Sequence, residues 1–133
     1  MTTMDDRAVD TEAAVAVQRA WAEAFAARDL DRLISLYADQ TAFYGSTAAF
    51  YTTREGVRTY FELLPERFTA AEYQIPHIVP LGDDAVAATG EVTFYSTEGG
   101  KTAAIPYRMT HVLVRRDGLW KIATHHASPR PTE

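Results

Sequence analysis

The stretch TAAIPYRMTHVLVRRDGLWKIATHHAS (102–128) decides the fold, because it predicts a long antiparallel hairpin. Its Asp117-Gly118 pair lies between two runs of alternating apolar residues, which is the strongest short-range signal for a two-residue type I′ turn. Such a short turn also fixes how the two strands pair. The predicted register opposes Arg116 to Leu119, Leu113 to Ile122, His111 to Thr124 and Met109 to His126.

The alternation of side chains along each strand assigns every residue of the hairpin to one of two faces. The face with Trp120 and Ile122 buries the larger apolar groups and is therefore the predicted inner face. The same face carries Tyr107, Met109, His111, Thr124 and His126. The outer face carries an apolar stripe that a monomer would expose, so we expect it to bury against a second copy of the chain. The stripe consists of Val112, Val114, Leu119 and Ala123.

Length, charge and composition narrow the class of protein. A chain of 133 residues fits one domain, and the absence of cysteine excludes disulfides, thiolate metal sites and a cysteine nucleophile. The formal net charge of −5, with no basic block, argues against nucleic acid as a partner. The sequence contains no signal peptide or membrane span, so we expect a soluble cytoplasmic protein with no membrane partner.

The rest of the chain reads as helices followed by strands. Helices are predicted from Asp10 or Thr11 to Ala27, from Asp29 to Ala38, and from Thr53 to a stop or kink at Pro65. Strands are predicted over 40–44, 72–81 (with Pro76 at an edge or bulge), 85–95 and the hairpin. We expect a disordered tail over 1–9, a single domain over 10–128 and a short tail over 129–133.

This order of elements is typical of an α+β fold. A strand from Thr102 to Arg116 is too long to stay flat, and Pro106 gives it a place to bend. We therefore expect a strongly curved, mixed or antiparallel sheet with three N-terminal helices on its concave side. Together they form a conical barrel with one open mouth.

Four segments together resemble a known superfamily: DLDRLISLYADQTAFYGS (29–46), TREGVRTYF (53–61), PLGDDAVAATGEVTF (80–94) and VLVRRDGLWKIATHHAS (112–128). They resemble the SnoaL-like branch of the nuclear transport factor 2-like superfamily. The similarity is closest to the SgcJ/EcaC group, which is similar to the calcium/calmodulin-dependent kinase II association domain. The resemblance implies a conical barrel, a homodimer and a pocket between the first helix and the sheet. It also implies a place in natural-product biosynthesis, including that of enediyne polyketides.

The resemblance also implies which family machinery is missing. Trp21 stands where the ketosteroid isomerases of the superfamily carry a tyrosine, and Gly45 stands where they carry the proton-shuttling aspartate. No nucleotide-phosphate loop is visible, so we predict no cofactor. We predict no metal, because His125 points away from His126 and His77 lies on another strand, whereas a metal site needs three converging ligands.

The candidate catalytic residues are His111, His126 and Glu91. Imidazole gains or loses a proton near neutral pH, and two histidines share the predicted inner face. Alternatively, both are hydrogen-bonded pocket walls with no role in turnover. Glu91 is a general base of raised pKa if it faces inward, or a solvated charge if it faces outward. The loop over 96–101 leaves its face undecided.

An aromatic wall with a few polar groups predicts a pocket for an apolar or planar ligand. Its candidate residues are Trp21, Phe25, Tyr44, Phe50, Tyr51, Phe61, Tyr107, Met109 and Thr124, all of which have core packing as the alternative role. Two hypotheses for function follow. The first is a protein that binds an apolar, polyketide-like intermediate. It is an enzyme if His111 donates a proton to this ligand or accepts one from it. The second is a non-catalytic binding or dimeric assembly module.

Overall fold

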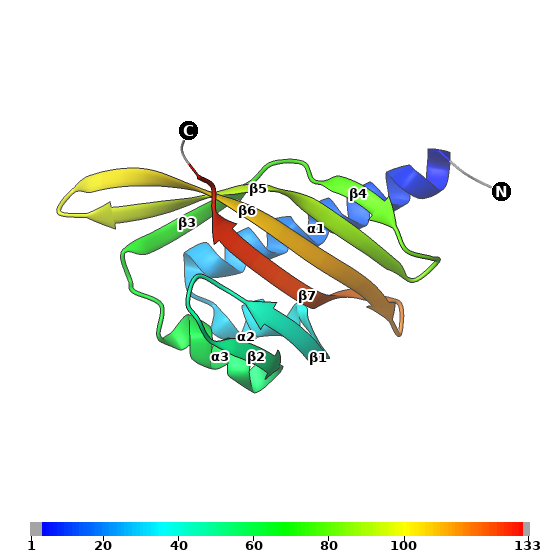
Figure 1. Ribbon diagram of the computed structural model, residues 1–133, viewed down its shortest axis with the longest axis horizontal. Helices are drawn as coiled ribbons and strands as arrows, with labels where there is room; N and C mark the ends of the chain where they lie inside the picture. Colours follow the sequence, from blue (N-terminus) through cyan, green and yellow to red (C-terminus); the bar gives the residue numbers. More distant parts are fainter. Residues whose placement is uncertain (1–3, 132–133) are drawn as a thin grey trace.

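The computed structural model describes residues 4–131, and side chains from residue 11 onward. Figure 1 shows three helices lying against one face of a curved sheet. The helices are α1 (Met4–Ala27), α2 (Leu30–Ser35) and α3 (Arg54–Glu62). The strands are β1 (Tyr37–Tyr44), β2 (Phe50–Thr53), β3 (Phe68–Tyr73), β4 (His77–Pro80), β5 (Ala85–Glu98), β6 (Lys101–Arg116) and β7 (Leu119–Pro129). Of the predicted tail over 1–9, residues 1–3 lie outside the described residues, and α1 begins at Met4.

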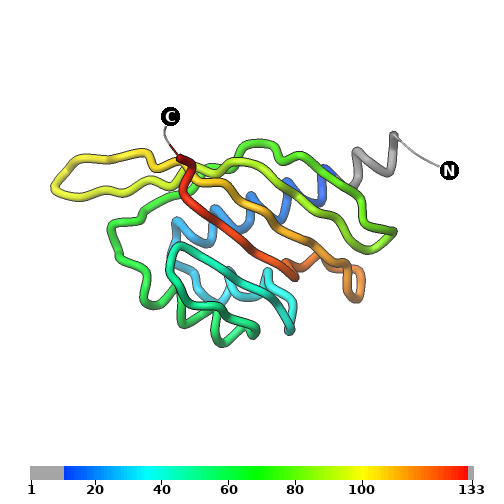
Figure 2. The backbone as a smooth tube through the Cα atoms, viewed as in Figure 1, coloured from blue at the N-terminus to red at the C-terminus, as the bar shows by residue number. Residues whose placement is uncertain are grey.

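The sheet is mixed, which confirms the predicted α+β class. Its strands follow the order β2-β1-β7-β6-β5-β3, and β4 pairs with β5 beside β3. The β1–β7 pair is parallel, whereas the other pairs are antiparallel. In Figure 2 the far ends of β5 and β6 extend well beyond the helices, while their other halves cover α1. The helices therefore enclose only the central part of the sheet, where the core lies.

Helix α1 is rich in alanine and has no glycine or proline, so its sequence favours a continuous helix. It ends at Ala27, and the next residue, Arg28, has a positive φ of 56° that turns the chain out of the helix. The guanidinium of Arg28 then donates to the carbonyl oxygens of Leu64, Pro65 and Phe68. These bonds fasten the segment after α3 against the end of α1.

The predicted helix caps at Asp29 and Thr53 are confirmed, whereas the predicted first cap at Asp10 or Thr11 is wrong, because α1 begins at Met4. The predicted strand containing Pro76 also needs a correction. Asp29 accepts from the backbone N–H of Arg32 and Thr53 from that of Gly56. The predicted strand over 72–81 is two strands, β3 and β4, interrupted before and at Pro76. Proline lacks the N–H that a continuous ladder would need there. Also, β2 lies within a segment that we predicted to be a loop.

The hairpin turn is confirmed, but the predicted register fails beyond Ile122. Asp117 and Gly118 both have positive φ, as a type I′ turn requires, and Leu113 pairs with Ile122 as predicted. Val112 then pairs with Thr124, because a β-bulge leaves Ala123 as an extra residue on β7. Every residue from Thr124 onward consequently points to the face opposite to the predicted one.

The bulge has a partner on β1. The Thr41 hydroxyl donates to the carbonyl oxygen of Ala123 at 2.9 Å, and Thr41 itself is buried. The parallel β1–β7 pairing is irregular at the same level, between Tyr37 and Ala42. The bulge is therefore shared by two neighbouring strands and stabilised by a buried side chain. Among the described residues, no helix is long and apolar enough to span a membrane.

Candidate active site

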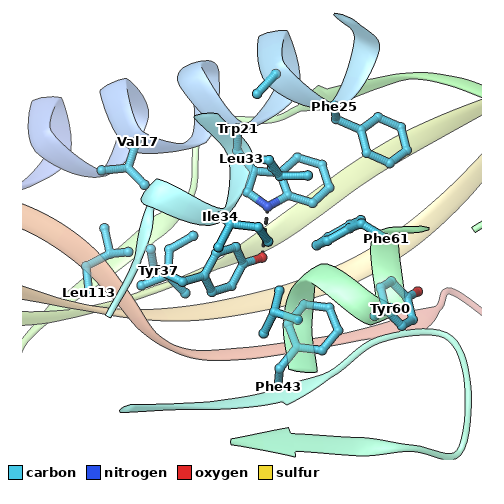
Figure 3. Close-up of a cluster of buried hydrophobic side chains, with 14 of the residues drawn as sticks. Val17, Trp21, Phe25, Leu33, Ile34, Tyr37, Phe43, Tyr60, Phe61 and Leu113 are labelled. Atoms are coloured by element: carbon cyan, nitrogen blue, oxygen red, sulfur yellow. Dashed lines mark hydrogen bonds between the residues drawn. The ribbon is translucent and has the colours of Figure 1, made fainter. Parts of the chain in front are cut away.

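A cavity of about 40 Å³ lies between α1, α3 and the concave face of the sheet. Its wall is mostly aromatic and aliphatic, and Figure 3 labels four of its side chains, Trp21 and Phe25 from α1 and Tyr60 and Phe61 from α3. The lining residues are Trp21, Phe25, Gly45, Ser46, Tyr60, Phe61, Leu64, Phe68, Phe94, Tyr107, His125 and Ala127. The volume accommodates a few water molecules. A larger ligand therefore requires the cavity to open.

His125 is the one titratable imidazole in this lining, and the bulge places it there. Its ring is 3% exposed and stacks on Phe43, with the centroids 4.2 Å apart. Trp21 and Tyr37 flank it at centroid distances of 6.2 and 5.9 Å. His125 thus lies in an aromatic pocket with one edge toward the cavity.

A chain of buried hydrogen bonds holds His125 from behind. Its Nδ1 lies 3.0 Å from His111 Nε2, and His111 Nδ1 lies 3.2 Å from the Gln18 side-chain nitrogen. The Tyr37 hydroxyl also lies 3.0 Å from His125 Nδ1, and it accepts from the Trp21 indole N–H at 2.9 Å. Figure 3 shows this Trp21–Tyr37 bond as a dashed line.

Because Nδ1 of His125 is engaged by two partners, Nε2 is the nitrogen left for the cavity. Within the described residues, Nε2 has no hydrogen-bond partner. Depending on the tautomer, it presents either a lone pair or an N–H group. His125 is therefore equipped to accept or to donate a proton at the cavity wall.

Burial keeps both histidines neutral. It lowers the pKa of His111 from 6.5 to about 3. Burial likewise lowers the pKa of His125 well below 6.5, and the neighbouring His111 and His126 add to this shift. Tyr37 stays protonated, because burial raises its pKa above the usual value of 10.0. At neutral pH the site therefore presents an uncharged imidazole, which is the form that accepts a proton.

The remaining polar groups of the cavity are hydroxyls on the side facing the β1–β2 loop. The Tyr60 hydroxyl accepts from the backbone N–H of Ser46 at 2.9 Å and lies 2.8 Å from the Ser46 hydroxyl. Tyr107 also lines this side, and burial raises the pKa of its hydroxyl, whereas a hydrogen bond with Ser46 acts in the opposite direction. A Cβ on Gly45 would collide with the Tyr60 ring, so glycine allows the loop to close over the cavity.

The structure corrects several predicted site residues. His126 is exposed on the outer face beside Tyr44, and Thr124 also lies on that face, because the bulge reverses both. Glu91 is exposed and forms an ion pair with Arg130 at 3.0 Å, so it is the solvated charge of our two alternatives. Tyr44 and Phe50 stack on each other outside, at 43% and 49% exposure.

Other predicted residues lie inside, but not all of them reach the cavity. Trp21, Phe25, Phe61 and Tyr107 line it as predicted. His111 faces inward as predicted, yet it is fully buried behind His125 and is absent from the lining. Met109 packs with Val92 and Ala127 in a separate cluster, and Tyr51 packs against Phe43.

Sequence reasoning missed His125, Tyr60, Ser46 and Gln18. Tyr60 had a usable signal, since it shares a face of the predicted third helix with Val57 and Phe61. His125 had none, because its inward position depends on the bulge and hence on Thr41, far away in the chain. Of the predicted outer stripe, Leu119 is exposed, whereas Val112, Val114 and Ala123 are half-buried.

Within the described part of the chain, no three His, Asp or Glu side chains gather to hold a metal ion. Fold and site together define a class of protein: a helix-covered curved sheet that encloses an apolar cavity with an imidazole on its wall. A family model, described as SnoaL-like domain, matches residues 15–132. The chain therefore belongs to the SnoaL-like domain family. No curated protein matches it significantly.

Solved structures share this fold. One from Xanthomonas campestris, described as a calcium/calmodulin-dependent protein kinase II association domain, is 27% identical over 89% of this chain and 86% of that chain, with a TM-score of 0.81. A ketosteroid isomerase-like protein from Erwinia carotovora atroseptica is 17% identical over 92% and 98%, with a TM-score of 0.80. A Streptomyces avermitilis protein, described as a dehydratase of the NTF2-like family, is 20% identical over 93% and 98%, with a TM-score of 0.78. The chain thus shares the NTF2-like fold of these structures.

Proposed function

We propose that this protein is a cofactor-independent acid–base enzyme that moves a proton on a small apolar ligand, with His125 as its catalytic residue. The observation that carries the proposal is that His125 lines the cavity while His111 and Tyr37 engage its Nδ1, which leaves Nε2 for a ligand. A general base needs to reach its proton and to be unprotonated at working pH, and burial keeps His125 neutral.

The reaction class follows from a single imidazole in an apolar cavity. Neutral His125 removes a proton from a carbon next to a carbonyl, and the electron pair of the broken C–H bond forms an enolate. In an isomerisation, the imidazolium returns that proton to another carbon. In a dehydration, it returns the proton to a leaving hydroxyl group, which departs as water while the carbon–carbon double bond forms.

The tyrosine hydroxyls suit the oxygen of such a ligand. Tyr60 and Tyr107 line the cavity together with Ser46, and each is a hydrogen-bond donor. A donor placed where negative charge develops stabilises an enolate oxygen, and its effect is larger in a cavity that excludes water. We assign this role to Tyr60 or Tyr107, with Trp21, Phe25 and Phe61 as apolar walls.

The narrower part of the proposal concerns the ligand. An apolar polyketide-like intermediate of natural-product biosynthesis, of the enediyne type, is the ligand that the resemblance to the SgcJ/EcaC group implies. The apolar lining is compatible with such a ligand. Two similar structures, described as a ketosteroid isomerase-like protein and as a dehydratase, support acid–base chemistry in general.

Exchange of the α-protons of β-tetralone in D2O, followed by proton NMR, tests the proposal. β-Tetralone is a small apolar ketone whose α-protons exchange only when a base removes them. The wild-type protein is expected to accelerate the exchange, and His125→Gln to lose about 100-fold or more of that rate. His126→Gln is the matched control, because His126 is the next residue and is exposed on the outer face. Equal rates in the wild type and His125→Gln would remove His125 from the chemistry.

A second candidate function is a non-catalytic, dimeric binding or assembly module. The observation that favours it is the 27% identity to the structure described as a kinase association domain. In this alternative the outer stripe of Val112, Val114, Leu119 and Ala123 is a homodimer interface. Val114→Glu would bury a charge in that contact and is expected to give monomers in analytical ultracentrifugation. An unchanged dimer mass, or a monomeric wild type, would contradict this interface.

A further inference from the structure

The side chain of Gln18 occupies the inner end of the hydrogen-bonded chain behind His125. It lies on α1 at 3% exposure, and its nitrogen faces His111 Nδ1 at 3.2 Å. Its oxygen Oε1 is buried and has no hydrogen-bond partner among the described residues. A buried polar atom without a partner is uncommon and calls for a physical explanation.

Two arrangements of protons satisfy the chain equally well. In the first, the Gln18 N–H donates to His111 Nδ1, His111 Nε2–H donates to His125 Nδ1, and His125 presents Nε2–H to the cavity. In the second, the Gln18 amide is reversed, so that Oε1 accepts from His111 Nδ1–H. His111 Nε2 then accepts from His125 Nδ1–H, and His125 presents a lone pair to the cavity.

Reversing the amide exchanges these arrangements without losing a hydrogen bond. In either orientation one end of the amide bonds to His111 and the other end has no partner. The Tyr37 hydroxyl fits both, because it shares the single bonding site of His125 Nδ1 with His111, donating to the lone pair in the first arrangement and accepting from Nδ1–H in the second. Had Oε1 been bonded elsewhere, one orientation would have been fixed.

We propose that Gln18 is a positioning residue whose amide reverses to let the His111–His125 pair change tautomer, so that His125 Nε2 is a base in one form and a hydrogen-bond donor in the other. This inference rests on the proposed function. After His125 Nε2 accepts a proton, its Nδ1–H faces His111 Nε2, and the Gln18 oxygen faces His111 Nδ1–H. The pair therefore shares the added charge until the proton returns to the ligand.

Two substitutions at position 18 are expected to fix opposite tautomers. Gln18→Glu places an acceptor-only carboxylate beside His111, which holds His111 Nδ1–H and leaves His125 Nε2 unprotonated. Gln18→Met removes every strong hydrogen-bonding atom at this position. His111 Nδ1 then has no partner, and an unpaired lone pair costs less there than an unpaired N–H. His125 Nε2 is then protonated. Nitrogen-15 NMR of the histidine rings distinguishes protonated from unprotonated ring nitrogens directly.

The expected result is a mixture of tautomers in the wild type, with a protonated His125 Nε2 in Gln18→Met and an unprotonated one in Gln18→Glu. Gln18→Met is also expected to lose about 100-fold in β-tetralone exchange, because it lacks the base form. Tyr73→Phe is the matched control. Among the described side chains, its hydroxyl is the other buried polar atom without a partner, and its removal breaks no bond of the Gln18–His111–His125 chain. The control is expected to retain the wild-type spectrum.

The same His125 tautomer in all three proteins would overturn the inference. Should Gln18→Glu fail to fold, identical His125 signals in the wild type and Gln18→Met overturn it as well. The NMR readout does not depend on turnover. Opposite tautomers in the two variants, without any β-tetralone exchange, would support the amide reversal and contradict the proposed function. Exchange that depends on His125, with the same tautomer in all proteins, would support the proposed function and contradict the amide reversal.

Discussion

His125 and His126 are neighbours in the sequence and opposites in the structure. The ring of His125 is buried against Phe43 and lies within a chain of hydrogen bonds, whereas that of His126 is exposed beside Tyr44. One extra residue in β7 accounts for the difference, because the bulge at Ala123 decides which histidine faces inward. Which histidine is available for chemistry in the cavity therefore depends on a local irregularity of the sheet.

The largest difference between the buried and the exposed face is expected in the dependence of folding stability on acidic pH. His111 and His125 have folded-state pKa values below 6.5, so the unfolded chain takes up protons that the folded chain excludes. Their contribution to stability is complete above pH 6.5 and is lost as the pH falls toward 3. The loss approaches about 1.4 kcal/mol per pH unit for each histidine.

Denaturant unfolding at a series of pH values measures this dependence. His111→Gln is expected to reduce the slope below pH 6.5, because it removes one buried imidazole. His126→Gln is expected to change the slope less than His111→Gln, since His126 is exposed and its replacement removes no buried imidazole. A slope that falls equally in both variants would mean that the two faces do not differ as the structure indicates.

A smaller effect is expected from the side chain that stabilises the bulge. Thr41→Val keeps the shape of the residue but removes the hydroxyl that bonds the Ala123 carbonyl. We expect a loss of about 1–3 kcal/mol in the free energy of unfolding, together with broadened NMR signals of His125. Thr52→Val on β2 is the control, because Thr52 is exposed. Equal stability of the two variants would show that the bulge does not need Thr41.

The smallest effect is expected on the outer face. Glu91→Gln breaks an ion pair with Arg130 in which both side chains are about half exposed. Exposed pairs of this kind contribute less than about 1 kcal/mol, and salt screens them. We expect a change within that limit in thermal unfolding, and unchanged β-tetralone exchange. A loss of exchange would restore Glu91 as a candidate base.

Local signals in the sequence predicted much of the fold. The Asp117-Gly118 turn, the caps at Asp29 and Thr53 and the end of α3 before Pro65 each depend on a few adjacent residues, and the structure has all of them. The β-bulge depends instead on Thr41, which lies on another strand. Side-chain alternation carries no information about such a partner, so the predicted faces were right up to Ile122 and wrong beyond it.

The candidate site was predictable to the same extent. Trp21, Phe25, Phe61 and Tyr107 follow from regular helical or strand periodicity, and they line the cavity. His125 comes after the β-bulge at Ala123. Regular side-chain alternation therefore predicted His126, and not His125, on the inner face. Glutamine is mostly exposed in proteins, so the sequence did not predict a buried Gln18. Only the packing of α1 against the sheet brings Gln18 to His111.

The most direct test of the proposed site is to observe whether a ligand contacts His125 or His126. We would titrate β-tetralone into the protein, labelled with nitrogen-15 in its histidine rings, and follow the ring signals by NMR. We expect saturable shifts of the His125 ring, and of His111 through its hydrogen bond, with no change at His126. Shifts confined to His126, with His125 unaffected at saturation, would contradict it.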